Sequence, residues 1–165
     1  MTHASRNTTT GLTFEQKAML DRKDGINISK KDFLSFFKKH FYIEPAKTKN
    51  TPNGILSWSF EPDEAYYFPE RNELIIYEKK HQETNGTVDL KLASCAWWYN
   101  EYKRLCDAIG IDNLSYIFIL DEWFRDPTPK PRATSNKERY TSMLEYIRNT
   151  PGCDYFFWGD GEIAT

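Results

Sequence analysis

Apolar residues alternate with turn signals in the middle of the chain, between Asp63 and Lys80. Residues 64–68 form an aromatic run with the composition of a β-strand, and residues 73–78 are rich in β-branched and aromatic side chains. The intervening residues 69–72 contain the proline, asparagine and charged residues that are typical of a turn. The pattern predicts a β-hairpin.

Four segments outside the hairpin have the features of helices, and the first two follow residues of the kind that cap helix starts. The predicted helices are residues 14–23, 30–42, 88–109 and 136–149. Three apolar runs predict further strands at residues 55–60, 114–121 and 154–158. Residues 124–135 hold prolines and basic groups and are expected to form a loop. This order of elements predicts an α/β fold with a mixed central sheet flanked by helices.

Length and composition favour one domain. The chain has 165 residues, of which 39% are hydrophobic, and this is enough for a substantial core. Residues 1–11 are rich in Thr, Ser and Asn and are expected to be disordered, and residues 12–165 are expected to form a single domain. A mean hydropathy of -0.71 and the lack of a long apolar run argue against membrane association and a signal segment, so the expected compartment is the cytoplasm.

The charge balance limits how the chain could bind nucleic acid. A formal net charge of -2 and a pI near 6.0 do not provide the overall positive field of a nonspecific nucleic-acid binder. Basic residues do cluster locally, at residues 30–39, 47–49 and 130–139. Any contact with DNA is therefore expected to be local.

The predicted hairpin brings three charged residues together. Asp63 precedes the first strand, so in an antiparallel pair it lies across from the end of the second strand, where Glu78 is found. Side chains alternate between the two faces of a strand, so Glu78 and Lys80 point to one side and Lys79 points to the other. We therefore expect Asp63, Glu78 and Lys80 to converge.

Two adjacent carboxylates repel each other unless a cation joins them. A site made of oxygen ligands with room for water suits Mg²⁺, or Mn²⁺ as a substitute, better than zinc. A divalent ion between Asp63 and Glu78 could polarise a phosphoryl oxygen, and Lys80 could orient or deprotonate the attacking water. These are the groups that phosphodiester hydrolysis requires.

Pro62, Asp63, Glu78 and Lys80 match, in order and type, the motif of the PD-(D/E)XK nuclease superfamily, which this chain resembles over residues 55–121. The superfamily includes type II restriction endonucleases, junction resolvases and repair nucleases. The resemblance implies a restriction-endonuclease-like αβββαβ core and a Mg²⁺-dependent endodeoxyribonuclease that cuts double-stranded DNA and leaves 5′-phosphate ends. A glutamine two places after the lysine is frequent in restriction-type members, so Gln82 is expected to contact the active-site water or the DNA.

The resemblance also implies accessory groups. Many relatives complete the metal site with an acid from the first helix, and Glu15 is the candidate here. A Gly-Ser/Thr segment and an acidic-Lys pair often follow the catalytic strand; Gly86-Thr87, Asp89 and Lys91 occupy these places, and Lys91 could hold a DNA phosphate. Cutting both strands of a symmetric site requires two active sites, so a homodimer is the expected form.

Two other functions and a purely structural interpretation remain open. A junction resolvase or repair nuclease would use the same residues, and sensitivity to DNA branching rather than sequence would identify it. A non-catalytic DNA-binding protein could keep the fold, and weak metal binding would identify it. Residues 78–81 could also be the solvated end of a strand, with Asp63 capping a turn.

Overall fold

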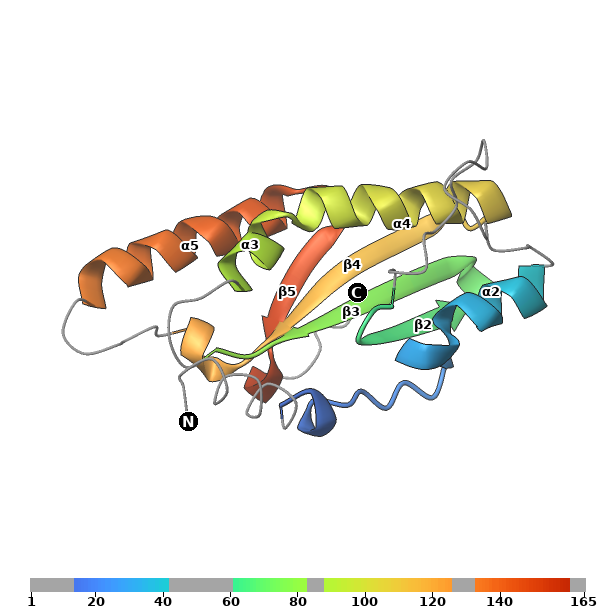
Figure 1. Cartoon of the computed structure of the whole chain (residues 1–165), viewed down its shortest axis with the longest axis horizontal. Coiled ribbons are helices and arrows are strands. Elements are labelled where there is room, and N and C mark those ends of the chain that lie inside the picture. The colour runs from blue at the N-terminus through green and yellow to red at the C-terminus, as the bar shows by residue number, and fades with distance from the viewer. Residues whose placement is uncertain (1–13, 42–60, 83–87, 126–132, 161–165) are drawn as a thin grey trace.

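The structure, a computed structural model, describes residues 14–41, 61–82, 88–125 and 133–160. Within these ranges the chain forms a five-stranded mixed sheet flanked by helices (Figure 1). The α/β class and the mixed sheet that the sequence predicts are therefore confirmed. No helix in the described ranges has the length and apolar character that crossing a membrane would require.

The sheet has a simple strand order, β1-β2-β3-β4-β5. The strands β1, β2 and β3 are antiparallel, whereas β4 is parallel to β3 and β5 is parallel to β4. Helices connect the parallel strands, as parallel pairing requires. The strands are β1 (Ile26–Ser29), β2 (Glu64–Phe68), β3 (Glu73–Lys80), β4 (Asn113–Leu120) and β5 (Cys153–Phe157).

The hairpin of β2 and β3 agrees with its prediction. A 3-10 turn, Pro69–Arg71, joins the two strands, and the fixed φ of Pro69 suits its first position. Asn72 follows with a φ of 46°, the left-handed region that asparagine tolerates. The Asn72 side chain donates a hydrogen bond to the Gly110 carbonyl at 2.7 Å, which ties the hairpin turn to the loop before β4.

Helices α3, α4 and α5 lie along one side of the sheet (Figure 1). There α4 packs on β4 and β5, α5 packs on β5, and the short α3 contacts both helices. Helix α2 joins the same core through Phe33 and Phe37. The helices are α2 (Phe33–Phe41), α3 (Val88–Ala93), α4 (Cys95–Ile109) and α5 (Ala133–Asn149).

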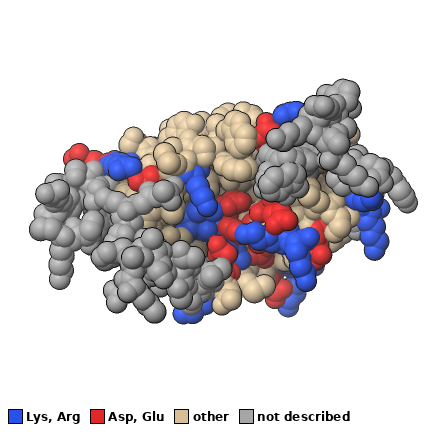
Figure 2. All heavy atoms as spheres, in the orientation of Figure 1, with Lys and Arg blue, Asp and Glu red and all other residues tan. Residues whose placement is uncertain are grey.

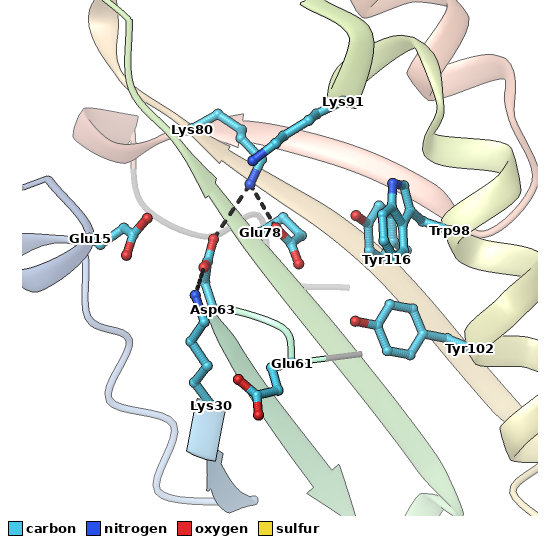
Figure 3. A pocket seen from close by; sticks show the side chains of 10 residues that line it. All are labelled: Glu15, Lys30, Glu61, Asp63, Glu78, Lys80, Lys91, Trp98, Tyr102 and Tyr116. Atoms are coloured by element: carbon cyan, nitrogen blue, oxygen red, sulfur yellow. Dashed lines mark hydrogen bonds and ion pairs between the residues drawn. The ribbon is translucent and has the colours of Figure 1, made fainter. Parts of the chain in front are cut away.

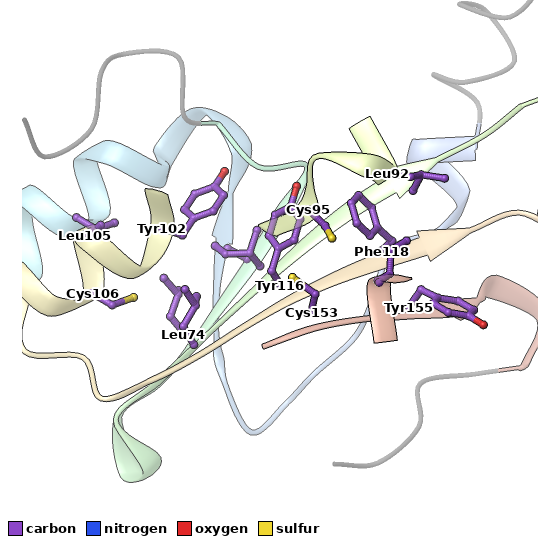
Figure 4. Close-up of a cluster of buried hydrophobic side chains, with 14 of the residues drawn as sticks. Leu74, Leu92, Cys95, Tyr102, Leu105, Cys106, Tyr116, Phe118, Cys153 and Tyr155 are labelled. Carbon is purple, nitrogen blue, oxygen red and sulfur yellow. The ribbon is translucent and has the colours of Figure 1, made fainter. Parts of the chain in front are cut away.

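Strand alternation divides the core into two clusters, one on each face of the sheet. Leu74 and Ile76 of β3 belong to the cluster under the helices, which Figure 4 shows. Ile75 and Tyr77 belong to the opposite cluster, against the segment that begins with Phe14. Because this alternation continues along β3, Glu78 and Lys80 lie on the helix side and Lys79 lies on the opposite side.

The first predicted helix, residues 14–23, is wrong in length. Only residues 14–17 are helical, and the chain then continues without regular structure. Tertiary contacts replace the helical hydrogen bonds in this continuation: the Tyr66 hydroxyl donates to the Leu20 carbonyl at 2.6 Å. Ala18 is fully buried against the sheet.

The second predicted helix, residues 30–42, begins later than expected. A 3-10 turn, Lys30–Asp32, precedes α2, and β1 comes directly before that turn. The Ser29 hydroxyl donates to the Asp32 carboxylate and caps no backbone N–H group. Strand β1 was not predicted, because four residues with two polar positions give little strand signal on their own.

The predicted helix of residues 88–109 is two helices. The helix is interrupted at Ser94, between α3 and α4, and the Ser94 hydroxyl donates to the Lys91 carbonyl at 3.0 Å. Such a bond competes with helical hydrogen bonding. Helix α5 begins at Ala133, three residues before its predicted start and inside the predicted loop.

Several expectations concern residues that the structure does not describe. The disordered N-terminus at residues 1–11, the strand at residues 55–60 and the Gly86-Thr87 pair all lie outside the described ranges. Residues 126–132 of the predicted loop lie outside them as well.

Candidate functional site

A solvent-open pocket of about 220 Å³ lies where β2 and β3 meet the helical layer (Figure 3). Its lining combines carboxylates, lysines and aromatic rings. The acids are Glu15, Glu61, Asp63 and Glu78; the lysines are Lys30, Lys80 and Lys91; and the aromatic residues are Trp98, Tyr102 and Tyr116. The three residues that the hairpin pattern predicts to converge all line this pocket.

The strand register brings the two central carboxylates together. Glu64 pairs with Tyr77, so Asp63, one residue earlier, comes opposite Glu78. The Lys79 backbone N–H donates to Asp63 Oδ2 at 2.8 Å and fixes the orientation of that carboxylate. The neighbourhood of Asp63 and Glu78 is thus a direct consequence of antiparallel pairing.

Lys80 joins the two carboxylates. Its Nζ lies 2.6 Å from Glu78 Oε2 and 3.5 Å from Asp63 Oδ2, and its side chain is only 8% exposed (Figure 3). Burial by itself would lower the pKa of Lys80, but the charges of Glu78 and Asp63 outweigh that effect and raise the pKa above 10.5. Lys80 is therefore a fixed positive charge in the pocket without a metal.

The two carboxyl groups differ in acidity. Burial raises the pKa of Glu78 above its usual 4.5; Lys80 opposes this effect, and the charge of Asp63 adds to it. Burial also acts on Asp63, but Lys80, the Lys79 N–H group and Lys30 together bring the pKa of Asp63 below its usual value. Ionisation of Glu78 is thus less favourable in the pocket than in water.

Lys30 is a site residue that the sequence analysis identified only as part of a basic cluster. It follows β1, and its Nζ lies 3.1 Å from Asp63 Oδ1. Lys30 and Asp63 are 33 residues apart, and the pairing of β1 with β2 brings them together. No local spacing rule could have predicted this contact.

Glu15 comes to the pocket as the superfamily resemblance implied. It lies in the helical turn at residues 14–17, and its side chain extends toward Asp63 (Figure 3). The Glu15 carbonyl accepts a hydrogen bond from Lys79 Nζ at 3.2 Å. A second hollow of about 330 Å³ adjoins the pocket and shares Glu15, Lys30 and Asp63 with it.

Gln82 does not line the pocket. Its side chain is buried, and Nε2 donates to the Tyr140 hydroxyl of α5 at 3.0 Å. Tyr140 in turn donates to the buried Asp89 carboxylate, which also accepts from Arg139 Nη2. The structure therefore places Gln82 and Asp89 in a polar network between β3, α3 and α5, whereas Lys91 of the same acidic-Lys pair does reach the pocket.

Aromatic residues form the wall opposite the carboxylates. The hydroxyl groups of Tyr102 and Tyr116 point into the pocket, and both residues are at most 2% exposed (Figure 3). Burial, followed by the charge of Glu78, raises the pKa of both phenols. These hydroxyl groups therefore remain protonated and can donate hydrogen bonds to an anion.

The donor set suits a hard divalent cation. The carboxylates of Asp63 and Glu78 offer oxygen ligands, and the described residues that line the pocket include no thiol or imidazole. Within the described ranges, no group of three or more His, Cys, Asp or Glu side chains is arranged to hold a metal ion. Water and substrate oxygens would supply the remaining ligands, as is usual for Mg²⁺.

Relatives of known function would help to interpret this site. Comparisons with protein-family models, curated proteins and solved structures gave no match to this chain. The likeness to the PD-(D/E)XK nucleases consequently stays a prediction from the motif.

Proposed function

We propose that this chain is a Mg²⁺-dependent endodeoxyribonuclease of restriction type, with its active site in the pocket of Asp63, Glu78 and Lys80. The observation that carries the proposal is the contact of one buried ammonium group with two facing carboxylates in a solvent-open pocket. A solvated strand end would leave these side chains extended into water. Here they converge, and burial together with the charge of Asp63 raises the pKa of Glu78.

Asp63 and Glu78 are the metal ligands in this proposal, with Glu15 as a third acid nearby. Bound Mg²⁺ would polarise the phosphoryl oxygen and lower the pKa of a water molecule. The Lys79 N–H group and Lys30 hold the Asp63 carboxylate in place before any metal arrives. Such preorganisation avoids a reorganisation cost during the reaction.

Lys80 acts as a hydrogen-bond donor rather than as a base. Its raised pKa keeps the ammonium group protonated in the pocket without metal. A protonated lysine cannot remove a proton from water, but it can orient the water and stabilise the negative charge that develops on the phosphoryl group. The Tyr102 and Tyr116 hydroxyls face the same space and can donate to phosphoryl oxygens.

The charge pattern around the pocket supports a local contact with a phosphate backbone. Figure 2 shows Asp and Glu side chains in the middle of this face, with Lys and Arg side chains beside them. Among the pocket-lining residues, Lys30 and Lys91 can contact phosphates that flank the cleaved bond. The adjoining hollow also contains Lys30, and a DNA strand could pass along it beside the carboxylates.

The finer assignment to the restriction type has one support in the fold and one consequence for the assembly. Three antiparallel strands followed by a helical crossover to a parallel strand are compatible with the αβββαβ core expected from the motif. Double-strand cleavage at a symmetric sequence would require two copies of this pocket, and we therefore include a homodimer bound to double-stranded DNA in the proposal.

The test is cleavage of supercoiled plasmid and phage DNA in Mg²⁺, with EDTA as a control. We expect discrete fragments from the unchanged protein and a cleavage rate about 100- to 1,000-fold lower for Lys80→Ala. Lys103→Ala is the matched control, because Lys103 lies on the surface of α4 and pairs with Asp107 outside the pocket. Its cleavage rate should equal that of the unchanged protein.

Other outcomes would redirect the assignment. Cleavage of branched DNA alone would identify a junction or repair nuclease that uses the same residues. DNA binding without cleavage in Mg²⁺ or Mn²⁺ would identify a non-catalytic DNA-binding protein. Equal cleavage by the unchanged protein and Lys80→Ala would show that the activity comes from elsewhere and would overturn the proposal.

A further inference from the structure

Two residues beside the site acids form a buried ion pair on the other face of the sheet. Glu64 follows Asp63 and Lys79 follows Glu78, and alternation turns both side chains away from the pocket. Lys79 Nζ lies 2.7 Å from Glu64 Oε2, with side-chain exposures of 4% and 5%. Burying two charges is costly, so this pair requires a physical reason other than packing.

The contacts of Lys79 suggest that reason. Its backbone N–H donates to Asp63 Oδ2 at 2.8 Å, and its Nζ donates to the Glu15 carbonyl at 3.2 Å. One residue thus holds a pocket carboxylate through its main chain and the chain segment of another acid through its side chain. A nonpolar residue at this position could keep the first contact but could not make the second.

The segment that carries Glu15 depends on such contacts. Residues 14–17 are the described part of its helix, and from Ala18 onward tertiary contacts take the place of helical hydrogen bonds. Glu64 contributes through the pair with Lys79, and its Oε1 lies 2.8 Å from the Tyr66 hydroxyl. The same hydroxyl lies 2.6 Å from the Leu20 carbonyl. The ion pair therefore contributes polar contacts to an attachment that also includes the packing of Phe14, Ala18 and Leu20 against the sheet.

We propose that Lys79, held by Glu64, is a positioning residue that fixes the segment of Glu15 beside the pocket and so keeps the Glu15 carboxylate close to the metal ligands Asp63 and Glu78. This inference depends on the proposed metal-dependent function. Lys79 itself lines the adjoining hollow and does not line the pocket of Asp63 and Glu78. A contact on one face of the sheet therefore sets the position of an acid on the other.

The first test measures Mn²⁺ affinity by titration calorimetry in four proteins: unchanged, Glu15→Gln, Lys79→Met/Glu64→Gln, and the three changes combined. The paired change replaces both charges by neutral groups of similar size, so no unpaired charge stays buried. We expect Glu15→Gln and the paired change each to lower affinity about 10- to 100-fold, as groups that support metal ligands do. The protein with all three changes should lose no more Mn²⁺ affinity than Glu15→Gln or the paired change alone, because both act through the same carboxylate.

The second test needs no metal. Trypsin can cleave after Lys17, Arg22 and Lys23, which all lie in or next to the attached segment. We expect the paired change to accelerate cleavage there, as mapped by mass spectrometry, while circular dichroism shows an intact fold. Lys103→Met/Asp107→Asn, which removes an exposed pair on α4, is the matched control and should change neither trypsin cleavage nor Mn²⁺ affinity.

The outcomes separate the two proposals. Additive losses of affinity, or an unchanged affinity after the paired change, would overturn the positioning role while leaving the nuclease proposal intact. Failure of the unchanged protein to bind Mn²⁺ would overturn the metal-dependent function and the metal role of Glu15 with it. Unchanged trypsin cleavage after the paired change would show that Lys79 does not hold the segment, whatever the metal result.

Discussion

Lys80 Nζ lies 2.6 Å from Glu78 Oε2, yet the pKa of Glu78 stays above its usual 4.5. Burial and the nearby negative charge of Asp63 oppose the ionisation of Glu78 more strongly than Lys80 favours it. The protein therefore holds Glu78 in a position where its charge is unfavourable until another cation arrives. Functional sites often contain such groups, at a cost in stability.

Replacing Glu78 by glutamine should stabilise the protein in the absence of metal. Glutamine resembles the neutral carboxyl group that the pocket prefers, so the penalty for ionising Glu78 disappears. We expect Glu78→Gln to raise the Tm by about 2 to 4 °C at neutral pH in EDTA, as measured by calorimetry. Glu101→Gln, an exchange in a surface ion pair of α4, is the control and should not raise the Tm. A lower Tm for Glu78→Gln would contradict the conclusion that ionised Glu78 destabilises the fold in the absence of metal.

The same carboxyl group predicts a pH dependence of metal binding. The folded protein binds the Glu78 proton more tightly than the unfolded chain does. Protonated Glu78 therefore adds to the stability of the fold at low pH. This contribution is lost as the pH rises from 4.5 through the raised pKa. A bound cation must displace that proton, so Mn²⁺ affinity should increase with pH across this window, by at most about tenfold per pH unit.

The measurement is a Mn²⁺ titration followed by electron paramagnetic resonance from about pH 5 to about pH 8. The pKa of Asp63 lies below its usual 3.8, so Asp63 should add no slope in this range. Glu78→Gln should bind Mn²⁺ weakly and with a flat pH profile. An unchanged slope in that variant would assign the proton to another group.

The central part of the site was predictable because it depends on local geometry. The hairpin of residues 64–78 has strong strand and turn signals, and antiparallel pairing then places Asp63 opposite Glu78. Alternation along β3 adds Lys80 to the same face. Register and periodicity are properties of a short stretch of sequence, and for that reason these three residues could be placed without a structure.

The rest of the site depends on contacts between distant segments. Lys30 reaches Asp63 only because β1, which the sequence analysis missed, adds to the edge of the hairpin. The Lys79 side chain was predicted only to point away from Glu78 and Lys80, and its burial against Glu64 was not predicted. Neither contact leaves a signal in local spacing, because each depends on how a separate segment packs on the sheet.

Removal of Lys79 alone should destabilise the protein strongly. Lys79→Met would leave the Glu64 carboxylate buried without its cation, and an uncompensated charge of this kind costs about 3 to 5 kcal/mol. Adding Glu64→Gln should recover a large part of that loss. Urea unfolding of both proteins measures the difference. Lys103→Met, at an exposed pair, should change the free energy of unfolding little. Equal losses for the single and double changes would contradict the importance of the buried charge.

Gln82 offers a direct comparison between the superfamily resemblance and the structure. The resemblance predicts a contact with the active-site water or DNA, whereas Gln82 Nε2 donates to the Tyr140 hydroxyl away from the pocket. Gln82→Met keeps the length of the side chain and removes that bond. We expect a loss of about 1 kcal/mol in the free energy of unfolding, because the buried Tyr140 oxygen loses a donor.

The same variant should bind Mn²⁺ with the affinity of the unchanged protein, because Gln82 is not among the described residues that line the pocket. Tyr140→Phe is the matched variant, since it removes the other partner of the same bond, and it should resemble Gln82→Met in metal affinity. Urea unfolding and Mn²⁺ titration together separate the two roles. Slower DNA cleavage by Gln82→Met without loss of stability would favour the role that the resemblance implies. A loss of stability with unchanged cleavage would instead make Gln82 part of the support that α5 gives to the end of β3.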